Sequence, residues 1–421
     1  MSTSTHLPPL AAPRLGLLAL GLATLLPMLA ASMGGILLPA LGAAFHLPFA
    51  ILQWVLVAYL LGLTCLTVVA GRLGDRFGRR RLLLCGMGGF ALASLLCALA
   101  PTIGWLIAAR VLQGASAACM LTLSLAMVGQ LVSPARRGWS MGLLGTLSAC
   151  GTALGPSFGG LLLEVAGWQA AFLALLPLGL LALLAAAWLV RSELGSPAPL
   201  LPLALLRTRR LRGALAASAL VAGVMVATLL IGPFYLQGVF GLGPLTSGLL
   251  ISGGPLLAAL SGMPAGWLVD RVGATTVVRL GLLVMSASVV LLATLGSSGG
   301  PVGYLLPVLL LTAGYALFQT ANNSLVIGAA DEQTRGAVAG LLTLSRNLGQ
   351  LTGAAGLGAL FAALAGGGNP AVASASELAF AMRATFALTA LLLMSALWLA
   401  GRGEGDVPGN ATREDCELGG R

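Results

Sequence analysis

The sequence predicts an all-α polytopic membrane protein, with twelve transmembrane helices arranged as two pseudo-symmetric six-helix bundles. Composition is the first reason, because 58% of the 421 residues are hydrophobic and only 8% are charged, whereas a soluble domain carries about 25% charged residues. The second is a series of apolar runs long enough to cross a bilayer as helices, in which every backbone hydrogen bond is satisfied. The third is an internal repeat that relates the two halves of the chain.

Breaks between the apolar runs define twelve predicted spans. The first run resembles a secretory signal, but it continues to about Leu41. Because the apolar part of a signal has roughly 7–15 residues, we interpret this run as a retained span. In chain order the spans are 15–41, 51–71, 82–100, 103–131, 138–163, 170–190, 214–240, 247–269, 276–296, 302–330, 336–363 and 379–400.

The longest polar connection, residues 191–213, separates the first six spans from the last six. It predicts a cytoplasmic linker between two bundles, and the polar, glycine-rich end of the chain predicts a disordered tail. The expected organisation is a cytoplasmic N-terminal tail (1–14), a six-helix bundle (15–190), the linker (191–213), a second six-helix bundle (214–400) and a cytoplasmic tail (401–421).

The basic residues predict the orientation of the chain. Apart from two histidines they are all arginine, and they gather in the loops on one side of the predicted membrane. Because cytoplasmic loops carry the excess of basic residues, we expect both termini in the cytoplasm. The absence of lysine excludes the P-loop lysine of an ATP-driven domain. The net charge of +10 has no polar basic domain around it, so no nucleic-acid partner is expected.

Two pairs of similar segments form the internal repeat. GRLGDRFGRRRLLL (71–84) is echoed by GWLVDRVGATTVVRL (266–280), and RRGWSMGLLGTLSACGTALG (136–155) by TRGAVAGLLTLSRNLGQLTG (334–353). The two offsets are nearly equal, which indicates duplicated halves. Parallel repeats of six helices, each a nested inverted pair of three, are typical of one transporter architecture.

The segment 71–84 places charges and glycines at the edge of the membrane, between spans two and three. Its glycines permit a tight turn and close helix packing, while Asp75 is costly there unless it is paired. We predict a gating loop in which Asp75 holds a neighbouring helix in one state and releases it in another. The alternative is a tight turn that only marks topology. The predicted loop residues are Gly71, Asp75, Arg76, Gly78 and Arg79.

Three motifs together resemble the major facilitator superfamily, and in particular its multidrug-resistance branch of drug:proton antiporters. They are GRLGDRFGRR between spans two and three, LIAARVLQGASAA (106–118) in span four and GTALGPSFGG (151–160) in span five. GWQAAFLALLPLG (167–179) and YLQGVFGLGPLTSGL (235–249) are also similar to that branch. The likeness covers roughly residues 15–400.

The resemblance implies a secondary active transporter that works by alternating access, in which a cavity between the halves opens to each side in turn. Small lipophilic compounds or drugs would leave the cell in exchange for protons. It also implies that the Asp75 loop engages span eleven near Gly336. In span five, a kink and packing against the other half are implied for Gly151, Gly155, Pro156 and Gly159. Ordinary packing of small residues is the alternative.

Two arginines lie deep inside predicted spans, Arg110 in span four and Arg346 in span eleven. A buried arginine is costly unless it is paired or hydrated, so both are candidate functional residues, with Gln113 beside Arg110. The alternative is packing by hydrogen bonds to backbone carbonyls. Proton coupling needs a group that titrates, and arginine keeps its proton. No carboxylate lies near the bilayer centre, so Glu164 at the outer edge is the first candidate and Asp75 the second.

Uncharged polar and aromatic residues inside spans are candidates for the cavity wall. They are Tyr59, Tyr235, Gln237, Gln319, Asn322 and Asn323. Each is equally suited to hydrogen bonding between helices. A cavity with apolar walls, arginines and no central carboxylate favours lipophilic compounds that are neutral or anionic.

Fewer observations support other functions. A facilitator or importer of a specific small metabolite on the same fold is the alternative to efflux. An intramembrane enzyme would need clustered carboxylates for a metal, whereas Asp75 and Asp270 are isolated. We therefore expect no enzyme activity, cofactor or metal, and a monomer in the lipid bilayer with a small-molecule substrate and protons as partners. A chain without lysine and rich in Ala, Leu and Gly suggests a GC-rich genome and the inner membrane of a bacterium.

Overall fold

The structure, a computed structural model, describes residues 12–131, 137–189, 209–295, 299–328, 335–366, 370 and 372–402. Regular secondary structure within these residues is α-helical throughout. The helices are α1 (Ala12–Phe45), α2 (Phe49–Leu52), α3 (Trp54–Phe77), α4 (Arg79–Ala98), α5 (Ile103–Leu131), α6 (Arg137–Leu173), α7 (Leu175–Leu189), α8 (Arg209–Phe240), α9 (Pro244–Val272), α10 (Ala274–Leu295), α11 (Gly300–Gly328), α12 (Arg335–Leu364) and α13 (Ala375–Arg402).

Predicted spans five and six run together in the structure. The backbone of α6 leaves helical geometry at Gly167 (φ 82°), where the chain turns between the two spans, and α7 completes span six. Of the described helical stretches, ten are long and apolar enough to cross a membrane, and one of them, Leu143–Ala187, has 45 residues. That length accommodates both spans, because about 20 residues suffice for one crossing.

The predicted span 336–363 is the helix α12, but it is not among those ten apolar stretches. Polar side chains explain this, since Thr343, Ser345, Arg346 and Asn347 follow one another closely. A transmembrane helix with so many polar groups faces protein or a water-filled cavity rather than lipid. α12 is therefore an interior helix of the bundle.

Two helices begin inside segments that were predicted as linker or tail. α8 begins at Arg209, within the predicted linker 191–213, and α1 begins by Ala12, within the predicted tail 1–14. Apolar runs mark the hydrocarbon region, whereas a helix continues beyond it as long as its backbone bonds are made. The rest of the linker and of both predicted tails lies outside the described residues, apart from the first residues of α1 and the last residues of α13.

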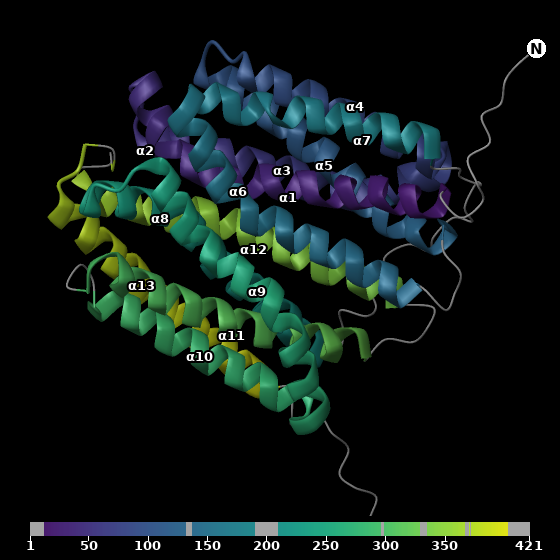
Figure 1. Ribbon diagram of the computed structural model, residues 1–421. Helices are drawn as coiled ribbons and strands as arrows, with labels where there is room; N and C mark the ends of the chain where they lie inside the picture. The colour runs from purple at the N-terminus through teal and green to yellow at the C-terminus, as the bar shows by residue number, and fades with distance from the viewer. Residues whose placement is uncertain are drawn as a thin grey trace, which may run out of the picture.

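The helices form two six-helix bundles. In Figure 1, α1, α3, α4, α5 and α7 lie together in the upper part, and α10, α11 and α13 in the lower part. Between them, α6 packs against α9, α3 against α12 and α1 against α8, which joins the two halves. The first half comprises α1–α7 and the second α8–α13.

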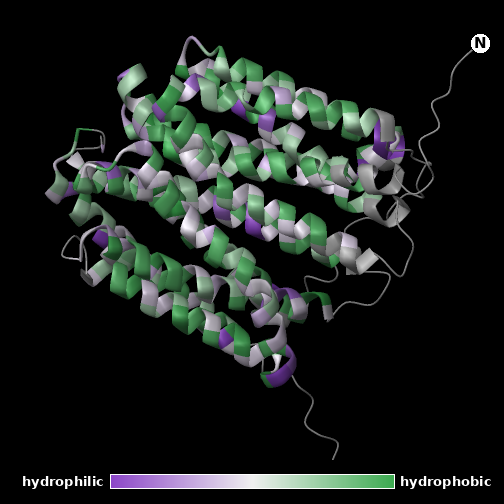
Figure 2. Cartoon of the chain, viewed as in Figure 1, coloured by the Kyte–Doolittle hydropathy of each residue, from purple (hydrophilic) through white to green (hydrophobic). Residues whose placement is uncertain are grey.

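The two ends of the bundle differ in charge. One end, which we call the arginine-rich end, carries Arg72, Arg76 and Arg79–Arg81 of the first half and Arg271 of the second. The other, which we call the hairpin end, carries the turns at 46–48, 99–102 and 241–243. Figure 2 shows hydrophobic residues along the lengths of the helices and hydrophilic ones gathered towards the ends.

The internal repeat is visible in the backbone at the turns of the arginine-rich end. Gly78 (φ 94°) and Gly273 (φ 85°) both have positive φ angles, which a glycine adopts without strain. Each N–H donates to the carbonyl four residues earlier, and each carbonyl accepts from the N–H four residues later. The sequence echo 71–84 and 266–280 thus corresponds to the same turn in both halves.

The second echo corresponds to the same helix packing. A Cβ on Gly151 or Gly155 of α6 would collide with backbone or side-chain atoms of α1, and one on Gly349 or Gly353 of α12 would collide with backbone atoms of α8. The equivalent helices therefore approach closely through equivalent glycines, which is how small residues pack helices in membranes. The two halves are related by this repeat.

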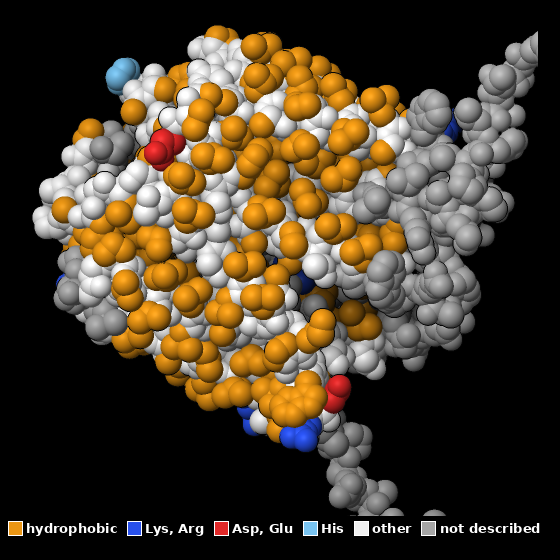
Figure 3. All heavy atoms as spheres, in the orientation of Figure 1, with side chains coloured by type: hydrophobic (Ala, Val, Ile, Leu, Met, Phe, Trp, Pro, Cys, Tyr) orange, Lys and Arg blue, Asp and Glu red, His pale blue; other side chains and the backbone are white. Residues whose placement is uncertain are grey.

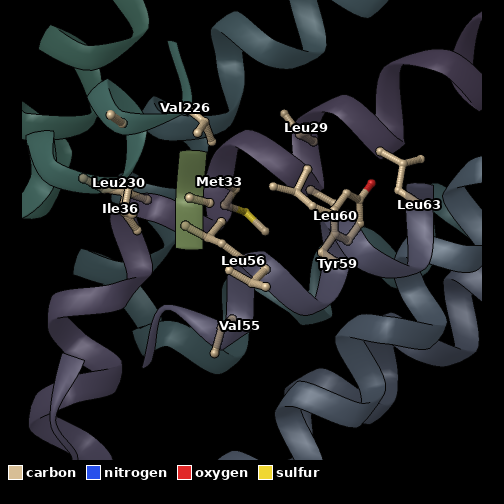
Figure 4. Packing of buried hydrophobic residues seen from close by; sticks show 14 of the residues in the cluster. Leu29, Met33, Ile36, Val55, Leu56, Tyr59, Leu60, Leu63, Val226 and Leu230 are labelled. Atoms are coloured by element: carbon tan, nitrogen blue, oxygen red, sulfur yellow. The ribbon is translucent and has the colours of Figure 1, made fainter. Parts of the chain in front are cut away.

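The apolar core continues across the boundary between the halves. Figure 4 shows Met33 and Ile36 of α1 beside Val226 and Leu230 of α8, and all four belong to one buried cluster. The outer face is also hydrophobic, as Figure 3 shows. This is expected of helices that pack together inside and contact lipid tails outside.

Candidate functional site

The two halves meet most closely where α6 crosses α9, near the hairpin end. A Cβ on Gly160 would collide with the carbonyl oxygen of Pro244, and a Cβ on Gly248 would collide with that of Pro156. Between these points, the Ser157 and Ser252 Oγ atoms share a hydrogen bond of 2.5 Å. The backbones are in contact here, so neither helix can move without breaking the crossing.

Further contacts close the hairpin end between the other helices. A Cβ on Gly35 of α1 would collide with the carbonyl of Leu229 in α8. The Phe49 ring of α2 lies 5.1 Å from the Phe234 ring of α8 and 6.0 Å from the Phe361 ring of α12, centroid to centroid. All these residues lie in the parts of their helices nearest the hairpin end. The halves are therefore sealed by these contacts near that end, and a cavity between the ends of α1 and α8 lies outside the Gly35–Leu229 contact.

The glycines of predicted span five divide between two neighbours. Gly151, Gly155 and Gly159 face α1 of their own half, whereas Pro156 and Gly160 face α9 of the other half. Of these five residues, Pro156 and Gly160 are the ones that pack against the other half. Within α6 the backbone departs from helical φ and ψ at Gly167 rather than at Pro156.

Glu164 lies on the surface at the hairpin end. Its Oε2 accepts a hydrogen bond from the N–H of Leu245 at 3.2 Å, at the start of α9. A carboxylate at a helix N-terminus satisfies a free N–H and is favoured by the helix dipole. The side chain is exposed, so the geometry makes Glu164 a contact between the halves and places it away from the interior.

Arg110 is enclosed within the first half. Its side chain is 0% exposed, its Nε donates to the Val55 carbonyl at 3.0 Å, and its Nη1 donates to the Ala30 carbonyl at 3.3 Å and to Gln113 Oε1 at 2.6 Å. The guanidinium carbon lies 4.4 Å from the centre of the Tyr59 ring, a favourable cation–π distance. Arg110 therefore ties α1, α3 and α5 together, while its buried Nη2 has no hydrogen-bond partner among the described residues.

Gln113 and Tyr59 complete this buried network. The Gln113 Nε2 donates to Ser94 Oγ at 2.8 Å, and the Tyr59 hydroxyl donates to the Pro27 carbonyl at 2.7 Å. Both residues are at most 1% exposed. Both residues therefore form hydrogen bonds between helices, which was the alternative to a place in the cavity wall. Ser94, which the sequence did not single out, is a member of the same network.

The other cavity candidates occupy three different places. Tyr235 is buried against Phe240 and Tyr304 inside the second half, and Asn322 is buried with its Nδ2 donating to the Ala214 carbonyl at 3.4 Å. Gln237 lines a cavity of about 570 Å³ at the hairpin end, with His46 and Phe234 among its neighbours. Gln319 and Asn323 are partly exposed on α11.

The gating-loop residues lie at the arginine-rich end, as their position in the turn requires. Arg76 is exposed, with its guanidinium carbon 5.5 Å from the centre of the Phe77 ring, and Arg271 of the second half lies 4.3 Å from the Trp267 ring. Gly71 and Arg79 flank the turn in α3 and α4. The side chains of Asp75 and of residues 335–337, which include Gly336, lie outside the described part of the structure, so the predicted latch stays a prediction.

A partly exposed polar stripe runs along α11. Tyr315, Gln319 and Asn323 recur every four residues, which places them on one helix face, and α12, which carries Arg346, packs against α11. At the arginine-rich end the stripe opens into a cavity of about 360 Å³ that Asn323 lines. Figure 3 shows a hollow towards that end, with arginine atoms within it. Tyr315 was missed in the sequence, although its spacing from Gln319 was the available signal.

The family follows from a match over most of the chain. A family model described as "Major Facilitator Superfamily" matches residues 20–354. The chain belongs to this superfamily. The resemblance carried by the three motifs is therefore confirmed, and with it the fold of twelve helices in two bundles and a role in membrane transport.

The chain is similar to transporters of several bacteria, two of which are named for different substrates. The chain is 29% identical to the uncharacterized transporter YebQ of Escherichia coli over 77% of this chain and 84% of that protein. It is 27% identical to the tetracenomycin C resistance and export protein of Streptomyces glaucescens, over 83% and 76%. It is 26% identical to the riboflavin transporter RibZ of Clostridioides difficile, over 77% and 83%.

A solved structure has the same fold. It is the crystal structure of a bacterial homologue of the human lysosomal transporter Spinster, in an inward-facing and unoccupied conformation. The TM-score is 0.80 at 18% identity, and the match covers 94% of this chain and 98% of that one. At this identity the likeness concerns the arrangement of the helices.

Proposed function

We propose that this member of the superfamily exports small lipophilic compounds across a bacterial inner membrane by alternating access, in exchange for protons. The observation that carries the proposal is the asymmetry of the boundary between the halves. The halves are sealed by the α6–α9 crossing near the hairpin end, and a hollow with the α11 polar stripe opens towards the arginine-rich end. An opening on one side and a seal on the other describe one of the two states that alternating access requires.

The orientation and direction rest on charge and on the relatives. The arginine-rich end is assigned to the cytoplasm, because basic residues concentrate there, so the state described is open to the cytoplasm. A cytoplasmic opening receives compounds dissolved in the inner leaflet or in the cytoplasm, and the export protein among the relatives favours outward transport. The monomer is sufficient, since one chain supplies both halves.

Proton exchange is tested with purified protein in liposomes that contain a pH-sensitive dye. We expect a transported lipophilic compound to drive proton movement in the wild type, and Glu164→Gln to retain it, because an exposed residue at the sealed end has no access to the hollow. Nile red, dansylglycine and ethidium serve as neutral, anionic and cationic probes. Protein-free liposomes are the control for passive movement.

Each of three other results has a definite meaning. Compound movement without proton flux would replace the antiporter by a facilitator, and movement of a single polar metabolite would favour the alternative of a specific carrier. Loss of proton flux in Glu164→Gln would assign the proton to the hairpin end after all. If Glu164→Gln keeps its flux, Asp75 is the next residue to substitute.

A further inference from the structure

The position of Arg346 is fixed by the residues around it on α12. The Ser345 Oγ donates to the Leu215 carbonyl of α8 at 2.6 Å, and Gly349 approaches α8 so closely that a Cβ would overlap Ala219. These contacts hold this turn of α12 against α8. Arg346 lies on the adjacent helix face and remains partly exposed, whereas Arg110, also inside a helix bundle, is completely enclosed.

Arg346 has no compensating charge within the described residues. No hydrogen bond or ion pair joins its guanidinium to another residue that the structure describes. The described carboxylates Glu164 and Glu377 lie at the hairpin end and Asp270 at the arginine-rich end. An unpaired arginine inside a membrane protein is costly and belongs in a hydrated cavity or against an anion.

The surroundings of Arg346 form a route that a ligand can follow from the arginine-rich end. Gln319 and Asn323 continue from Tyr315 along α11, and all three are partly exposed. Asn323 reaches the cavity of about 360 Å³, whose other lining residues include Ile327. The face of α11 thus offers amide and phenol groups with apolar groups beside them, and the neighbouring helix α12 carries the partly exposed Arg346.

We propose that Arg346, with Tyr315 on the neighbouring helix α11, binds the acidic group of an anionic lipophilic substrate. This inference rests on the proposed function, because the bound molecule is taken to be the exported compound, and it adds the charge of that compound. A planar guanidinium donates two parallel hydrogen bonds to a carboxylate or sulfonate, and the Tyr315 hydroxyl is available as a further donor. The apolar body of the substrate lies along the hollow, and cations are repelled.

Dansylglycine and its uncharged amide, dansylglycinamide, form a matched pair of probes for this site. Binding to detergent-purified protein is measured by energy transfer from tryptophan to the dansyl group. We expect the wild type to bind the anion about tenfold more tightly than the amide, as charge-assisted hydrogen bonds allow. We expect Arg346→Gln to lose this preference and Arg346→Lys to keep part of it. Arg383→Gln, which removes an exposed arginine from α13, is the matched control and should keep the full preference.

Four results overturn the proposal: no binding of dansylglycine to the wild type, equal affinity for both probes, a preference that survives in Arg346→Gln, or an equal loss in Arg383→Gln. Displacement of dansylglycine by millimolar chloride also overturns it, because the site would then hold a simple inorganic anion. Failure to transport a probe that binds with the expected preference refutes export and leaves the anion site intact. The binding measurement therefore tests the anion site, and the transport measurement tests the proposed export.

Discussion

Replacing Gly248 with alanine is expected to lower the rate of transport by a factor of about ten or more. The added Cβ would overlap the carbonyl oxygen of Pro156 on α6, and a backbone atom cannot move aside as a flexible side chain can. Forcing extra volume into a packed contact costs about 1–3 kcal/mol, and each 1.4 kcal/mol changes an equilibrium about tenfold. The sealed hairpin end would therefore form less often, and the transport cycle would be interrupted.

Gly262 provides the matched control on the same helix. It lies in α9, and a Cβ there would have no heavy atom within 4 Å, so Gly262→Ala makes the same chemical change without the collision. Initial rates of substrate movement are measured in liposomes that contain equal amounts of each variant. Equal rates for Gly248→Ala and Gly262→Ala would show that the α6–α9 crossing does not limit transport.

Replacing Arg110 with methionine is expected to destabilise the protein more than any other single substitution of an arginine inside a span. It leaves the Val55 and Ala30 carbonyls and the Gln113 amide without their buried donor. A buried polar group without a partner costs about 1–3 kcal/mol, so the sum over three groups is about 3 kcal/mol or more. The thermal unfolding midpoint in detergent should fall accordingly.

The Arg110 substitution also separates packing from substrate contact. Because the guanidinium is 0% exposed, the protein that remains folded should keep the wild-type KM, while the amount of active protein falls. Arg383→Met, at an exposed site, is expected to leave the unfolding midpoint unchanged. A normal midpoint with a strongly raised KM in Arg110→Met would instead place Arg110 in the substrate site.

The sequence predicts much of the helical framework, because apolar runs, arginine-rich loops and repeats are local features. The echoes around Gly78 and Gly273, and around Gly151 and Gly349, correspond to equivalent turns and contacts. α12 was predicted from the apolar run 336–363, although its polar residues lower its hydropathy. In each case the signal lies within one short stretch of the chain.

The candidate site was predicted less well, because it depends on which way each helix is rotated. Arg110 and Arg346 look alike in the sequence, yet one is enclosed by three helices and the other is partly exposed. Gly248 and the Ser157–Ser252 pair carry the seal between the halves, and residues this far apart in the chain have no local pattern that pairs them. Such partners are fixed by tertiary packing.

Alternating access requires the seal at the hairpin end to open in every transport cycle. The Ser157 and Ser252 Oγ atoms lie 2.5 Å apart across the seal, so Ser157→Cys and Ser252→Cys together offer a disulfide between α6 and α9. Transport is measured in liposomes before oxidation, after oxidation and after reduction, with each single substitution as a control for the native cysteines, and mass spectrometry verifies the cross-link. We predict that transport falls to background in the oxidised double variant and returns on reduction. Undiminished transport by the cross-linked protein would contradict alternating access through this seal.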